Sequence, residues 1–220
     1  MKAKIALTSL VFLALAVGVA GAAIIPAPQT QVLLPGATIP KFVDPLPVAG
    51  DIEVVDATSA GANGDVFDVA AEEFQAQILP TGFCGPSWVY GYLTDPALKN
   101  AIRPSYLGPV IVAERGVPAY PNYLNNIPNP SNVQALLPID MTLDWANPDG
   151  IDCLPVANPV TGELEYTNPV CGTLPPYSGA MPIATHLHGG EVSPAFDGGP
   201  DAWFTSDGQV GPGFPGNVYS

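Results

Sequence analysis

The chain contains only two histidines, His186 and His188, and both lie in the stretch "MPIATHLHGG". Its alternating pattern predicts a β-strand, in which side chains two residues apart point to the same face. Both imidazoles are therefore expected on one face and Leu187 on the other. Their Cα atoms would be about 6 to 7 Å apart, which lets the rings bind one metal ion or two neighbouring ions. Gly189 and Gly190 would end the strand.

A His-x-His pair is weak evidence for a metal site when it stands alone. Many such pairs are surface residues or core histidines with satisfied hydrogen bonds, and a catalytic metal usually takes three or more protein ligands. Nearby carboxylates could add oxygen ligands, hydrogen-bond the histidines, or be solvated charges. These carboxylates are Glu191, Asp197, Asp201 and Asp207.

The composition predicts a loop-rich β protein of one domain. The 220 residues include 27 prolines and 23 glycines, while 47% are hydrophobic, which is enough for a core. The formal charge of −14 disfavours binding to nucleic acid or to anionic membranes. It would attract cations, including metal ions, or it could serve solubility or adaptation to salt.

Residues 1–22 have the pattern of a secretory signal peptide. Lys2 and Lys4 precede the apolar run Ile5–Ala16, and Ala20-Gly21-Ala22 supplies small residues for cleavage. Export to the periplasm, the cell surface or the outside is therefore expected, with no membrane contact after cleavage; an uncleaved anchor is the alternative. Loss of both lysines would change the charge to −16.

The remaining chain divides into a proline-rich arm and a β-rich region. Residues 23–50 hold six prolines and are expected to form an extended arm, while 51–220 would form the domain. Two β-prone runs flank Arg115-Gly116, which predicts a hairpin or a corner there. A helix over Ala70–Ile78 is a weaker alternative to a strand. The other strand candidates, typical of a β-sandwich or barrel, are "DIEVVDA", "DVFDVAAEEFQAQIL", "SWVYGYL" and "LPIDMTLDW".

Residues 147–179 read as a long inserted loop with little periodicity. Cys153 and Cys171 flank one proline-rich segment, and an exported protein can hold a disulfide between them. Cys84 would then be left as a free thiol or would pair with something absent. None of the three has a C-x-x-C partner, which disfavours a zinc knuckle or a thioredoxin-type site.

The stretch "THLHGGEVSPAFDGGPDAWFTSDGQVGPGF" resembles the first copper-binding motif of multicopper oxidases, most closely the spore-coat laccases and bilirubin oxidases of bacteria. The resemblance covers about Lys41 to the end, without the cysteine-containing insertion. Further similar stretches follow the same order, namely "IPKFVDPLPV", "EEFQAQILP", "WVYGYL", "SYLGPVIVAERGVPAYPNYLNNIP" and "LPIDMTLDW".

This resemblance implies an all-β, cupredoxin-like Greek-key sandwich, the first of three domains. Such enzymes hold four copper ions, take electrons from a small reducing substrate and reduce O₂ to water. By analogy, His186 would bind the type 2 copper and His188 one type 3 copper. Asp197 would match the acidic residue that assists proton supply near the cluster. The substrate could be a phenol, a bilirubin-like pigment or a metal ion.

The sequence departs from the family pattern in its ligand set. The second copper motif and the His-Cys-His motif of the blue copper are not found, so we expect a first domain that is incomplete at its C-terminus and inactive alone. One alternative is a separate secreted module that binds copper or another cation through His186, His188 and acidic side chains. Another is an interaction protein whose histidines are relics.

Overall fold

The computed structural model describes residues 32–48, 51–58, 65–137, 139, 146–150, 155–166 and 177–216. The signal-peptide prediction for 1–22 lies outside these residues. So do Cys153 and Cys171, the proposed disulfide partners, and most of "LPIDMTLDW". Among the described residues, Cys84 is an exposed free thiol.

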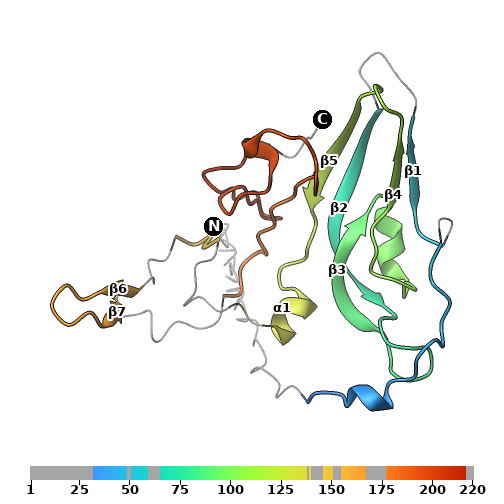
Figure 1. Cartoon of the computed structure of the whole chain (residues 1–220), viewed down its shortest axis with the longest axis horizontal. Coiled ribbons are helices and arrows are strands. Elements are labelled where there is room, and N and C mark those ends of the chain that lie inside the picture. The colour runs from blue at the N-terminus through green and yellow to red at the C-terminus, as the bar shows by residue number, and fades with distance from the viewer. Residues whose placement is uncertain are drawn as a thin grey trace, which may run out of the picture.

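Most of the regular secondary structure in the described part of the chain is strand, which confirms the all-β prediction (Figure 1). The strands are β1 (Val54–Ala57), β2 (Asp65–Ala76), β3 (Ser87–Leu93), β4 (Val110–Ala113), β5 (Ala119–Asn125), β6 (Pro155–Ala157) and β7 (Leu164–Tyr166). Among the residues that the structure describes, helix is limited to α1 (Asn132–Leu136) and to the 3₁₀ helices Gly36–Thr38, Pro96–Asn100 and Pro194–Phe196. No helix among the described residues is long and apolar enough to cross a membrane.

Three small sheets organise these strands. The largest has the order β3-β2-β5, in which β2 pairs antiparallel with β3 and parallel with β5. β1 and β4 form a parallel pair, and β6 and β7 form an antiparallel hairpin. This hairpin lies within 147–179, so the predicted insertion contains regular structure that its weak periodicity did not indicate.

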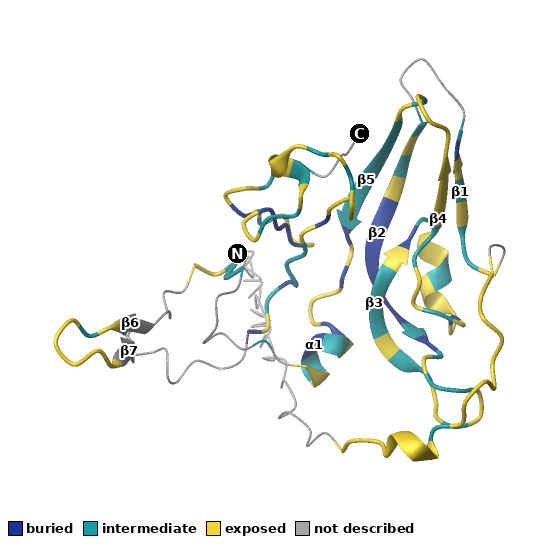
Figure 2. Ribbon diagram, viewed as in Figure 1, coloured by how far each residue is buried: buried dark blue, intermediate teal, exposed yellow. Residues whose placement is uncertain are grey.

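β2 is the central strand of the three-stranded sheet, and the helical alternative for Ala70–Ile78 is wrong. The strand continues to Ala76, and its residues from Val69 to Phe74 are all buried (Figure 2). β3 pairs with Ala70–Ala76 and β5 with Asp65–Ala71, so strand pairing outweighs any local preference of the Ala-Ala-Glu-Glu segment for helix. Phe74, Ala76 and Leu93 form the core cluster, with Val89 and Leu98 packed against it.

The segment around Arg115-Gly116 is a corner and not a hairpin. β4 and β5 flank it, but β4 pairs with β1 and β5 pairs with β2. The turn is closed by the Val117 amide, which donates to the Glu114 carbonyl at 3.0 Å. Gly116 has a φ of +87°, a conformation that side chains disfavour, and it lets the chain pass from one sheet to the other.

The described part of the arm, 32–48, is extended and mostly exposed (Figure 2). It contains one short 3₁₀ helix and no strand. The Asp44 carboxylate ties it to the domain by accepting a hydrogen bond of 2.9 Å from the Thr81 amide.

Candidate functional site

Residues 177–216 carry both histidines and lie beside β5 (Figure 1). The buried side chain of Asn125, at the end of β5, holds this segment in place. Its Nδ2 donates to the Met181 carbonyl at 2.8 Å and to the Phe204 carbonyl at 3.0 Å. Ile183 and Phe204 also exchange two backbone hydrogen bonds, of 3.0 and 2.9 Å. One amide thus fixes both sides of the loop to the central sheet.

The prediction of a strand through both histidines is wrong beyond its first residues. Ile183 forms an isolated bridge with Phe204, and no ladder continues to His186 or His188, which lies at the start of a turn. Phe204 bridges Ile183 on one side and Val210 on the other, and neither bridge extends into a ladder among the described residues.

The two imidazoles nevertheless lie together. Their ring centroids are 5.5 Å apart, and the ring planes meet at 74°. Both residues are exposed, while the preceding Thr185 is buried at 2% exposure and anchors the segment. Turn geometry, and not a strand, therefore presents two imidazoles as neighbours at the surface.

Asp197 is next to this pair. Its Oδ1 lies 3.6 Å from Nδ1 of His186, at the end of the 3₁₀ helix Pro194–Phe196. The following Gly198 has a φ of +65°, and a Cβ there would lie 2.9 Å from the His186 Cβ. Glycine at this position allows the loop to turn back against the histidine, which brings the carboxylate to the ring.

The other predicted carboxylates do not join the histidines in a metal-binding group. Asp207 closes a turn, because its carboxylate accepts hydrogen bonds from the Thr205 hydroxyl and from the side-chain amide of Gln209. The hydrogen bond from Thr205, and to a smaller extent that from Gln209, lowers the pKa of Asp207. Glu191 and Asp201 are exposed. Within the described ranges, no three His, Cys, Asp or Glu side chains form a group that could hold a metal ion.

Sequence reasoning missed Asn125. It lies in the stretch "NYLNNIP", which carries part of the family resemblance, but no local pattern marks an asparagine that binds carbonyls 56 and 79 residues away. A polar residue ending a predicted strand was the only available signal.

No family model matches the chain. It is 30% identical over 203 residues to a laccase of Haloferax volcanii, covering 90% of this chain and 28% of the relative. It is 28% identical over 186 residues to a laccase of Bacillus subtilis, covering 83% of this chain and 27% of the relative. A rice protein named multicopper oxidase LPR1 homolog 5 is 31% identical over 135 residues, covering 61% of this chain and 14% of the relative.

The chain is a member of the multicopper oxidase family. The mostly β architecture agrees with the cupredoxin-like domain that this family implies. The chain spans little more than a quarter of the length of the two laccases that it matches.

Multicopper oxidases use copper, and the histidine pair fits part of a copper site. Imidazole nitrogens are ligands that copper accepts, and both rings are accessible and adjacent. The chain has only these two histidines. His186 and His188 therefore fit one portion of a multicopper ligand set and not the whole of it.

Proposed function

We propose that this chain supplies the first His-x-His pair of the trinuclear copper cluster in an oxidase that reduces O₂ to water. The observation that carries the proposal is the pair itself: two exposed imidazoles, 5.5 Å apart, in a chain of the multicopper oxidase family. Neighbouring imidazoles at this spacing can serve neighbouring metal ions, as the family pattern requires.

His186 is proposed to bind the type 2 copper and His188 one type 3 copper. The bound copper ions would supply the redox chemistry with O₂. The protein's part is to hold the two rings at a fixed spacing, through Asn125 and the Ile183–Phe204 bridge. A fixed spacing lowers the entropy lost when both rings bind.

Asp197 is proposed to hold and move protons beside the pair. Its carboxylate lies 3.6 Å from His186 Nδ1 and is 70% exposed, so it can exchange protons with water. In the proposed reaction, protons reach the oxygen-reducing site while electrons arrive from the substrate.

The source of electrons is proposed to be a small reducing substrate of the laccase type, namely a phenol, a bilirubin-like pigment or a metal ion. Export is proposed from the leader pattern in residues 1–22, with action in the periplasm, at the cell surface or outside the cell. Mass spectrometry of the secreted protein tests this: a mature N-terminus at Ala23 is expected, and retention of Met1 in the membrane fraction contradicts it.

The copper proposal is tested by titrating Cu(II) into the metal-free chain and recording nitrogen couplings by electron paramagnetic resonance. We expect weak binding that His186→Ala and His188→Ala each reduce, and no oxidase activity from these residues alone. Glu163→Gln, an exposed carboxylate on the β6–β7 hairpin, is the control and should leave binding unchanged.

Tight stoichiometric binding that His186→Ala abolishes would replace the proposal with a separate copper-binding module. Sequencing the coding DNA past the Ser220 codon gives an independent test. Continuation into further histidine motifs, including His-Cys-His, is expected.

A further inference from the structure

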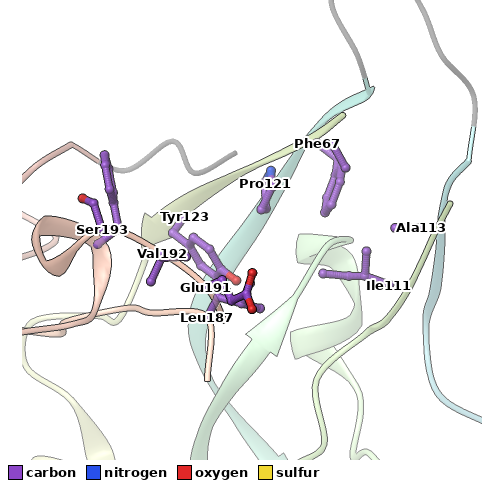
Figure 3. A pocket seen from close by; sticks show the side chains of 11 residues that line it. Phe67, Ile111, Ala113, Pro121, Tyr123, Leu187, Glu191, Val192 and Ser193 are labelled. Atoms are coloured by element: carbon purple, nitrogen blue, oxygen red, sulfur yellow. The ribbon is translucent and has the colours of Figure 1, made fainter. Parts of the chain in front are cut away.

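A cavity of about 570 Å³ lies behind the histidine segment, between that segment, β4 and β5 (Figure 3). Its walls include the side chains of Phe67 on β2, Ile111 on β4 and Tyr123 on β5. Leu187 and Phe196 close it from the loop. Cavities that hold small organic ligands have volumes in the range of about 300 to 1,000 Å³, so this one has the size of a ligand site.

The lining favours a flat, largely apolar ligand. Three aromatic rings, those of Phe67, Tyr123 and Phe196, come from three different parts of the chain. The Tyr123 ring is further held by an edge contact with Tyr92, with centroids 5.8 Å apart. Aromatic side chains in such walls bind planar molecules by stacking or edge contacts.

One charged group lines this cavity, the carboxylate of Glu191 (Figure 3). It forms no ion pair with any other described residue. No lysine or arginine lines the cavity, and the chain as a whole carries a formal charge of −14. A cation is therefore favoured both at the carboxylate and by the field of the whole protein.

We propose that this cavity binds a small aromatic molecule carrying one positive charge, with its ring among the aromatic side chains and its cationic group at Glu191. Aromatic faces also attract cations, which adds to this preference. The site is separate from the histidine rings and needs no copper, so it stands whether or not the copper proposal does.

The test uses two probes that share one ring and differ in charge, tryptamine and indole-3-propionate. Each is titrated calorimetrically into the whole chain, in EDTA and about 0.15 M salt, where long-range attraction is screened beyond about 8 Å. We expect saturable one-to-one binding of tryptamine and much weaker binding of the anion.

Variants assign the two halves of the site. Glu191→Gln should weaken tryptamine binding about three- to fivefold, as expected for an exposed ion pair, and leave indole-3-propionate no weaker. Ala113→Phe, which fills the cavity from β4, should abolish binding of tryptamine. Glu163→Gln removes a carboxylate outside the cavity and is the control for general charge; it should change nothing.

His186→Ala should keep tryptamine binding while it reduces copper binding, which separates this site from the proposed function. Equal affinity for both probes, or equal weakening by Glu191→Gln and Glu163→Gln, would overturn the proposal. So would tryptamine binding that does not saturate, or that Ala113→Phe leaves intact in a folded variant.

Discussion

The centre of β2 and the loop that carries the histidines both contain acidic side chains, but their surroundings differ. Glu73 is 6% exposed and accepts hydrogen bonds from the Ser131 hydroxyl, from the amides of Asn132 and Val133 and from the Asn132 side chain. Asp197 is exposed and has one ion-pair contact, at 3.6 Å. A fully bonded buried carboxylate specifies structure, whereas an exposed one remains able to exchange protons and ligands.

Glu72 and Glu73 extend the contrast within β2 itself. Adjacent strand residues point to opposite faces, so each needs its own partners. Glu72 pairs with Lys99 at 3.0 Å and accepts from Asn126 at 3.1 Å. Glu73 instead holds the first turn of α1. The central strand thereby fixes a different segment of chain on each side.

The largest expected effect is that of Glu73→Ala. It leaves the amides at the start of α1 and the Ser131 hydroxyl without their acceptor in a buried place, so we expect a loss of about 3 kcal/mol or more in the free energy of unfolding. Urea denaturation measures it. Glu163→Ala, at an exposed position, should change the value by less than about 0.5 kcal/mol; similar losses from both would show that Glu73 is not specially held.

Asn125→Ala comes next and tests how the histidine loop is attached. The Met181 carbonyl loses the Asn125 donor, and the Phe204 carbonyl loses one of its two donors and keeps the Ile183 amide, which should cost about 1 to 2 kcal/mol. Hydrogen exchange at the Ile183 and Phe204 amides should quicken, and copper binding should weaken.

Asn122→Ala on the same strand is the matched control, because Asn122 only donates to the exposed Asp68. Exchange at Ile183 and Phe204 should be unchanged in this variant. If both variants behave alike, Asn125 does not position the loop.

Replacement of Tyr177 should have a smaller effect on stability, and this effect depends on pH. Burial of its phenol, together with the negative charges of Asp149 and Asp207, raises its pKa from 10.0 to about 12. The unfolded chain therefore ionises first, so this contribution to stability is complete below about pH 10 and is lost as the pH rises towards 12. Between pH 9 and pH 11.5, the free energy of unfolding should fall less steeply with pH in Tyr177→Phe than in the unchanged protein. Equal slopes in the two proteins would contradict the raised pKa.

The smallest expected effect is that of Asp197→Asn. Because the His186–Asp197 contact is long and exposed, stability should change by no more than about 0.5 kcal/mol. In a complete oxidase, the same change should slow turnover more than it weakens substrate binding. Thermal unfolding measures the stability, and steady-state kinetics measures the turnover. A large loss of stability with normal turnover would show that Asp197, like Glu73, serves the structure and not proton transfer.

The sequence allowed prediction of the regular part of the fold better than of the loop. "SWVYGYL" is β3 from end to end, because β-branched and aromatic residues fit a paired strand and Leu93 is buried in the core. His186 and His188 were found from their types and spacing, although turns and not a strand bring the rings together. Asn125 escaped prediction because its two carbonyl partners are distant in sequence. The corner at Gly116 could not be told from a hairpin for the same reason: pairing partners decide it.

The parallel pairing of β2 with β5 also has a consequence for how the chain folds. β2 and β3 are close in sequence and can pair early, whereas Asn122 on β5 reaches Asp68 on β2 across 54 residues. The entropy cost of closing that loop comes before the stabilising contacts between β2 and β5 can form, which slows folding. Because the loop with the histidines is anchored to Asn125 at the end of β5, it can reach its final place only after this late strand has docked.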